Sequence, residues 1–172
     1  MGKDASVVPL DPAAVERRLM SRKRVLLSGA IADANGENAT DCTIRDMTAR
    51  GAQVQLPRTL QLGAEVYLVD TRNEVAHLAT VAWIKTDRTG LSFVRSYSLE
   101  LTLPPPLEFL GRLLIEVKLR QVRALIERGV PVEEATRVVG LTEDYLERFG
   151  KRGLFSEKVA LLLHQAKRLF SK

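Results

Sequence analysis

Apolar and polar residues alternate in short runs through the first 103 residues, a period of two that is typical of strands with one buried face. Turn-forming stretches such as DANGEN at 33–38 separate the runs, and no long helical pattern lies between them. The predicted strands cover residues 25–32, 41–47, 51–56, 64–70, 75–85 and 90–98. Short strands at this spacing predict an antiparallel barrel or sandwich, and we expect Trp83 in its core.

The pattern changes after three consecutive prolines, Pro104 to Pro106, which fix φ and remove three backbone donors. Beyond them, apolar residues recur at steps of three and four, as they do along one face of a helix. The predicted helices cover residues 109–126, 131–140, 141–150 and 156–170. Thr142 is a plausible N-cap for the third helix, and Gly150 is its expected stop.

Composition excludes several classes of protein. The 172 residues carry a net charge of +5 and are 45% hydrophobic and 27% charged, which is typical of a soluble globular protein. Cys42 is the only cysteine and the two histidines are far apart, so we expect neither a disulfide nor a metal site. No apolar stretch is long enough to span a membrane, and we expect a cytoplasmic location. The sequence shows no nucleophile–base pair and no Walker-type loop, so it does not predict an enzyme.

Two motifs carry chemistry. The basic stretch RRLMSRKR at 17–24 contains Arg18-x-x-x-Arg22, and Asp46-x-Thr48-x-x-Gly51 lies between the second and third predicted strands. A guanidinium pairs bidentately with phosphate and stacks on flat rings, and a carboxylate accepts from a donor pair such as guanine N1–H and N2–H. A hydroxyl can donate to a phosphate oxygen, and glycine lets the backbone approach a ligand. These residue types on strands predict a site for a guanine nucleotide with more than one phosphate.

In this order and spacing, with VAWI at 81–84 and GLSF at 90–93 further along, the motifs resemble the PilZ domain family, bacterial receptors for cyclic di-GMP. The resemblance covers about residues 15–101. It implies a six-stranded antiparallel β-barrel, followed in this chain by a small C-terminal helical bundle. It also implies that a basic N-terminal arm closes over a ligand on the outer face of the barrel.

The resemblance implies a role for each motif residue. Arg18 and Arg22 would hold the phosphates and stack on guanine, with Arg17 as a further contact. Lys23 and Arg24 fall outside the family pattern, and we expect them to attract the dianionic ligand.

The second motif would complete the site. Asp46 would read a guanine edge, and Gly51 would allow close approach. Thr48 stands where the family has serine, so the hydroxyl is kept but the added methyl stiffens χ1 and needs space. We expect weaker binding rather than none.

The helical tail allows two interpretations. Residues 131–150 resemble a helix-turn-helix, with Thr136 and Gly140 at the spacing of the small residue and the turn glycine. The second helix, however, begins with Glu143 and Asp144, and acidic side chains repel DNA phosphates. We therefore favour a protein-interaction module over a DNA reader. A homodimer through the apolar helix stripes stays open.

We thus expect four parts in the chain: an N-terminal tail (1–14), the PilZ-like barrel domain (15–103), a proline linker (104–106) and a helical extension (107–172). The predicted function is that of a cyclic di-GMP sensor or adaptor, without other cofactors, which signals to a partner protein through the extension. Such proteins often act on motility, surface polysaccharide or biofilm formation. One alternative is a ligand-responsive transcription regulator that uses residues 131–150. The other is a degenerate barrel that binds no nucleotide. The site could hold one ligand or a stacked pair.

Overall fold

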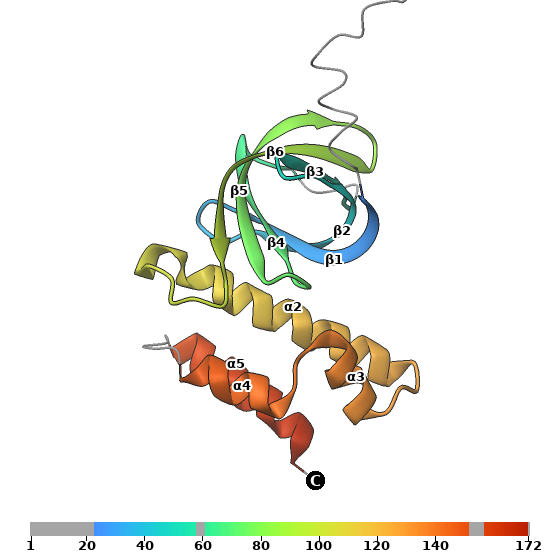
Figure 1. The fold of residues 1–172 in the computed structure, drawn as a ribbon, viewed down its shortest axis with the longest axis vertical. Coiled ribbons are helices and arrows are strands. Elements are labelled where there is room, and N and C mark those ends of the chain that lie inside the picture. The colour runs from blue at the N-terminus through green and yellow to red at the C-terminus, as the bar shows by residue number, and fades with distance from the viewer. Residues whose placement is uncertain (1–22, 58–60, 152–156, 172) are drawn as a thin grey trace, which may run out of the picture.

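Six antiparallel strands close into a barrel in the order β1-β2-β3-β6-β5-β4, as Figure 1 shows. The computed structural model describes residues 23–57, 61–151 and 157–171. The strands are β1 Lys23–Asp33, β2 Ala39–Met47, β3 Gly51–Gln55, β4 Glu65–Asp70, β5 Val75–Ile84 and β6 Arg88–Ser98. Each predicted strand is present within two residues at either end, and the barrel, rather than the sandwich, is confirmed.

Alternation along the strands produces two separate apolar clusters, because successive side chains point to opposite faces. The barrel interior contains Ile31, Ile44, Val54, Leu68 and Leu91, among others. The residues between them on β1, β4 and β5 pack outward against a helix; these are Ala30, Ala32, Tyr67, Val69 and Ala76. Strands β1 and β4 and the first half of β5 therefore have buried residues on both faces.

The helix on this outer face is α2 (Glu108–Glu127), which lies between the barrel and the remaining helices (Figure 1). One of its faces contributes Leu110, Leu114 and Val117 to the cluster with the strands. Leu114 is fully buried, and removing a leucine side chain from water stabilises a fold by about 2 kcal/mol. The predicted helical extension thus begins with a helix that is part of the barrel's own packing.

The prolines before α2 differ from our expectation. A 3-10 turn, η1, spans Pro105–Leu107, and the Leu107 N–H donates to the Pro104 carbonyl at 2.8 Å. We predicted a proline linker at 104–106, ahead of the helical extension. Proline is tolerated at the first helical positions because their N–H groups have no intrahelical acceptor. The chain therefore turns directly from the barrel into α2.

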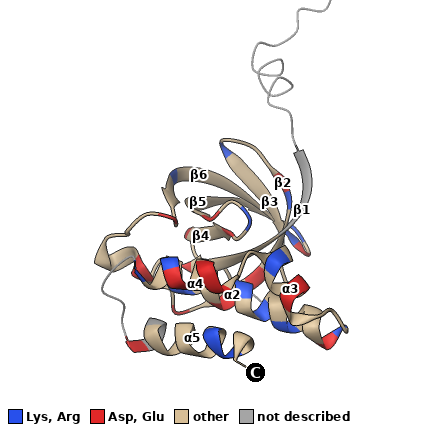
Figure 2. Cartoon of the chain, turned by 60° about the horizontal axis from the view of Figure 1, so that its bottom comes forward, with Lys and Arg blue, Asp and Glu red and all other residues tan. Residues whose placement is uncertain are grey.

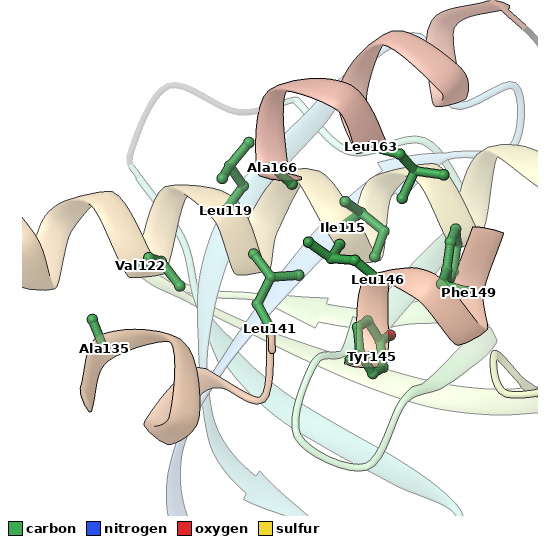
Figure 3. Packing of buried hydrophobic residues seen from close by; sticks show 10 residues of the cluster. All are labelled: Ile115, Leu119, Val122, Ala135, Leu141, Tyr145, Leu146, Phe149, Leu163 and Ala166. Atoms are coloured by element: carbon green, nitrogen blue, oxygen red, sulfur yellow. The ribbon is translucent and has the colours of Figure 1, made fainter. Parts of the chain in front are cut away.

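The opposite face of α2 packs against α3 (Val132–Val139), α4 (Glu143–Gly150) and α5 (Glu157–Lys167), which a short 3-10 turn, η2 (Arg168–Phe170), follows. Figure 3 shows the side chains that meet there, drawn from all four helices. The cluster is formed by Ile115, Leu119, Val122, Ala135, Leu141, Tyr145, Leu146, Phe149, Leu163 and Ala166. The predicted C-terminal bundle is confirmed, and α2 belongs to both this bundle and the barrel packing.

The turn between α3 and α4 follows the sequence pattern closely. Gly140 ends α3 with φ of 74°, a left-handed conformation that favours glycine. Thr142 caps α4 as predicted, since its side chain accepts from the Tyr145 N–H at 3.2 Å. Gly150 is instead the last residue of α4, and Lys151 forms the cap.

Within the described part of the chain, two ion pairs join α2 to the barrel. The Lys118 ammonium lies 2.7 Å from Glu74 in the β4–β5 turn, and both side chains are nearly buried, 4% and 12% exposed. The ammonium also lies 4.6 Å from the centre of the Tyr145 ring in α4. Arg120 donates two hydrogen bonds to Asp41 in β2, at 3.0 and 2.6 Å. Lys118 therefore contacts the barrel and the bundle together.

Candidate functional site

The structure divides the predicted site residues into two groups. Arg17, Arg18 and Arg22 lie outside the described residues. Asp46 ends strand β2 with its neighbour Met47, and Thr48 lies in the turn that leads to Gly51 at the start of β3. Asp46, Thr48 and Gly51 line one pocket of about 260 Å³ on the barrel. The second motif is therefore brought together, and the roles of its residues can be examined.

A β-bulge turns Asp46 to the outer face of the barrel. Ile44 pairs with Val54 and Asp46 with Gln53, so Arg45 is an extra residue on β2. In a regular strand Asp46 would point to the same side as Ile44, which is fully buried in the interior. The bulge reverses this phase. A carboxylate that would otherwise enter an apolar core thus lines the external pocket.

A second bulge does the same for Trp83, which we expected in the core. Val81 pairs with Leu91 and Trp83 with Gly90, so Ala82 is the extra residue on β5. Trp83 is consequently 40% exposed and lines the pocket. The prediction was wrong because the alternation of β5 changes phase at the bulge, which the apolar pattern alone does not indicate.

Asp46 and Trp83, the two residues that the bulges turn outward, lie at the ends of one row of paired residues across four strands. The register aligns Asp46 on β2 with Gln53 on β3, Gln53 with Gly90 on β6, and Gly90 with Trp83 on β5. All four residues line the pocket. A Cβ on Gly90 would lie 2.2 Å from the indole nitrogen of Trp83, so the ring lies directly over this glycine. The row therefore presents a carboxylate, an amide and an aromatic surface side by side.

One oxygen of the Asp46 carboxylate is a hydrogen-bond acceptor without a donor in the described part of the chain. Its Oδ1 is buried and has no hydrogen-bond partner among the described residues. A buried acceptor without a partner costs about 1–3 kcal/mol, so such a group in a pocket wall calls for a donor from elsewhere. The pocket wall thus includes an acceptor that the described part of the chain does not satisfy.

Thr48 makes hydrogen bonds within the β2–β3 turn and also lines the pocket. Its Oγ1 accepts from the Arg50 N–H at 3.1 Å, and its own N–H donates to the Gly51 carbonyl at 2.8 Å. The hydroxyl lies 3.5 Å from that same carbonyl, where it can donate a weak hydrogen bond. The hydroxyl thus stabilises the β2–β3 turn, a role that serine or threonine can fill.

Gly51 is required by the barrel itself. A Cβ at this position would lie 2.2 Å from the Leu91 carbonyl oxygen of β6, which no side chain can tolerate. Its φ is not positive, so the reason is close strand approach and not turn conformation. Gly51 therefore allows a close approach of β6, and the expected close approach of a ligand stays a prediction.

Sequence reasoning missed Gln53, Gly90 and the pocket role of Trp83. Alternation places Gln53 on the polar face of β3, yet nothing in the sequence marks it apart from Gln55. The stretches VAWI and GLSF contained the indole and its glycine, but their pairing depends on the β5–β6 register. The sequence indicated only that a tryptophan and a glycine, Trp83 and Gly90, lie on two consecutive predicted strands.

Three further features of the described residues are relevant to function. No group of three or more His, Cys, Asp or Glu side chains there is arranged to hold a metal ion. Cys42 lies in the barrel interior, where burial, and secondarily the charge of Asp41, raises the pKa of its thiol to about 12. Among the helices that the structure describes, none is long and apolar enough to cross a membrane.

Comparisons with known proteins agree with the motif resemblance. A sequence model of the PilZ domain family matches residues 16–115, more than half of the chain, and the match ends inside α2. No curated protein matches the chain. Among solved structures, the chain is similar to the PilZ domain of CeSA from a cellulose-synthesizing bacterium. That similarity has 16% identity and a TM-score of 0.38, and it covers 57% of this chain and 98% of the other.

Proposed function

Because the chain belongs to the PilZ domain family, whose members are receptors and adaptors for cyclic di-GMP, we propose that its barrel binds this nucleotide in the Asp46–Trp83 pocket. The observation that carries the proposal is the buried Asp46 Oδ1, which has no hydrogen-bond partner among the described residues. A guanine edge supplies the missing donors, since N1–H and N2–H point in the same direction.

The aromatic part of the pocket suits the same base. Trp83 presents its exposed ring at the end of the row that begins with Asp46, and Gly90 between them and beneath the indole carries no side chain. A purine stacked on an indole contributes about 1–3 kcal/mol. Guanine would therefore lie against Trp83 with its polar edge toward Asp46.

The phosphates require cations, and among the described residues that line the pocket only Arg50 carries a positive charge. Arg18 and Arg22, with Arg17 nearby, precede β1, and Arg24 of β1 pairs in register with Asp46 of β2. The chain therefore enters the barrel next to the row that would hold the base. We propose that Arg18 and Arg22, with Arg17, bind the phosphates by bidentate hydrogen bonds, as the family pattern implies.

Calorimetric titration of the purified protein with cyclic di-GMP tests the proposal. We expect binding in the micromolar range or tighter, and a loss of at least about tenfold in Arg22→Ala and in Asp46→Ala, because each removes charge-assisted hydrogen bonds. Matched controls are Glu65→Ala and Arg95→Ala, which remove exposed charges on β4 and β6 outside the pocket. Equal losses in the controls, or no binding by the wild type, would overturn the proposal and leave the degenerate barrel.

The output of binding would pass through the helices to a protein partner. The two faces of α2 pack against the barrel and against the other helices. A partner bound to α3–α5 would therefore keep a fixed position relative to the barrel. We therefore assign α3–α5 to partner binding. Crosslinking or pull-down with and without cyclic di-GMP tests this, and a partner still captured after residues 131–172 are exchanged for another bundle would contradict it.

The charges on α3 and α4 favour a protein partner over DNA. Glu143 and Asp144 are exposed at the start of α4. Lys151 pairs with Glu147 at 2.8 Å, and Arg148 pairs with Asp144 at 3.0 Å, so cations near the end of α4 are partly neutralised. The colouring in Figure 2 shows that the positions of acidic and basic residues alternate along α2, α3 and α4. A salt-dependent mobility shift with duplex DNA at low salt would instead support the regulator.

A further inference from the structure

Gln53 occupies the place between the carboxylate and the aromatic ring of the pocket. It is the register neighbour of Asp46 on one side and of Gly90 on the other, and its side chain lines the pocket with theirs. Directly opposed residues on neighbouring strands have Cβ atoms about 5 Å apart, so a glutamine amide and an aspartate carboxylate in such a pair can reach the same small ring.

The Gln53 amide is available, whereas its neighbour on the same face is not. Gln55, two residues along β3, donates from Nε2 to Asp87 Oδ2 at 3.1 Å. Among the described residues, no hydrogen bond involves the Gln53 side chain. The two glutamines lie on the same face of the same strand and have the same side chain, but only Gln53 lines the pocket.

We infer that Gln53 is a specificity-determining residue that donates from its side-chain amide to guanine O6, beside the N1–H and N2–H that Asp46 accepts. This inference rests on the proposed function. The polar edge of guanine presents one acceptor next to two donors, and an amide next to a carboxylate presents the complementary order. Adenine presents an amino donor and the N1 acceptor instead, so its N1 lone pair would face the Asp46 carboxylate.

Substitution of Gln53 by methionine and by glutamate tests the assignment by titration with cyclic di-GMP. Gln53→Met keeps the length of the side chain but removes the donor, and we expect binding weaker by about 3- to 10-fold. Gln53→Glu places a second carboxylate opposite O6 and near the phosphates, and we expect a larger loss that increases at low salt. Gln55→Met is the matched control, because it removes an amide from the same face without changing the pocket, and we expect wild-type affinity.

Ligand analogues locate the contact on the base. With cyclic di-inosine monophosphate, which keeps O6 and lacks the 2-amino group, Gln53→Met should lose the same factor as with cyclic di-GMP, whereas the loss in Asp46→Ala should shrink. With an analogue that carries sulfur in place of O6, a weaker acceptor, wild type and Gln53→Met should bind alike. A full Gln53→Met loss with the sulfur analogue would show that the effect is structural and would overturn the inference.

The outcomes separate this inference from the proposed function. Wild-type affinity in Gln53→Met, together with weak binding by Asp46→Ala, would overturn the role of Gln53 and leave the guanine site in place. No cyclic di-GMP binding by the wild type would overturn both. Thermal unfolding of Gln53→Met alongside Gln55→Met checks that each variant is folded at the titration temperature.

Discussion

Two polar regions on the outer surface of the barrel differ in whether their hydrogen-bonding groups have partners among the described residues. Under α2, the Lys118 ammonium is paired with Glu74 at 2.7 Å, and Arg120 pairs with Asp41. At the pocket, the Asp46 Oδ1 has no partner within the described residues, and Trp83 is exposed. The ion pairs of the α2 region are formed within the chain, whereas the pocket contains an acceptor that the described residues leave unpaired.

Strand β2 makes the contrast clear, because it contributes an aspartate to both regions. Asp41 accepts two hydrogen bonds from Arg120, while Asp46, at the other end of the strand, faces the pocket. The bulge at Arg45 lies between them. A single local irregularity thus separates a residue used for folding from one available for binding.

The largest expected effect concerns the buried ion pair. Glu74→Gln leaves the Lys118 ammonium buried without an opposite charge, and removing one partner of such a pair costs about 3 kcal/mol or more. Glutamine keeps the side-chain size at this position, whose φ is 54°, so added backbone strain does not enter the comparison. Chemical denaturation measures the free energy of unfolding.

Lys118→Met is the matched control for this prediction. It removes the buried cation but keeps apolar volume against Tyr145, and the Glu74 side chain lies nearer the surface at 12% exposure. We expect a loss of only about 1 kcal/mol. Equal losses in Glu74→Gln and Lys118→Met would mean that packing, and not the stranded charge, dominates at this position.

Two glycines separate folding from binding at the pocket. Gly51→Ala forces a Cβ against the Leu91 carbonyl, and the strands must move apart, which we expect to cost about 1–3 kcal/mol of unfolding free energy. In Gly90→Ala the new Cβ meets the exposed Trp83 ring, which can rotate away. Denaturation should therefore show a smaller loss for Gly90→Ala, and calorimetry should show weakened cyclic di-GMP binding. A stable Gly51→Ala barrel would contradict the close approach of β3 and β6.

Thr48 tests whether the hydroxyl serves the turn or the ligand. Thr48→Val deprives the Arg50 N–H of its acceptor, and we expect a loss of about 1 kcal/mol in unfolding free energy. Thr48→Ser keeps the hydroxyl and should leave that free energy within about 0.5 kcal/mol of the wild type. If Thr48→Val weakened ligand binding strongly at unchanged stability, the hydroxyl would belong to the ligand instead.

The smallest effect is a pH dependence from His77, which lies away from both regions. Its ring stacks on Phe93 at 4.0 Å, and burial lowers its pKa, partly opposed by the charge of Asp70. The unfolded chain therefore binds a proton at His77 more readily than the folded protein does. The neutral ring thus stabilises the fold at pH values above 6.5, the ordinary pKa of histidine, and this contribution is lost as the pH falls below that value.

Urea denaturation at several pH values measures this dependence. His77→Gln removes the titrating ring, so its stability should change less than that of the wild type as the pH falls from about 7.5 to 5. His164→Gln is the control, because that histidine is exposed in α5. The same slope in wild type and His77→Gln would assign the acid sensitivity to other groups.

Much of the fold followed from local patterns. The period of two placed all six strands and the period near 3.6 placed the four α-helices, because side-chain direction follows directly from backbone geometry. The Thr142 cap and the Gly140 turn were equally local, since each depends on residues within one turn. Asp46, Thr48 and Gly51 could be named because their spacing along a single β2–β3 connection is short.

Tertiary structure decided what those residues do. The bulges at Arg45 and Ala82 depend on the pairing of distant strands, and they turned Asp46 and Trp83 outward against the simple alternation. Gly51 meets Leu91 and Lys118 meets Glu74 only because the barrel closes and α2 docks on it. The sequence by itself determined the strands, the helices and the chemistry available to them. Register, closure and docking join residues far apart in the chain, and they decided which of the described side chains are paired and which line the pocket.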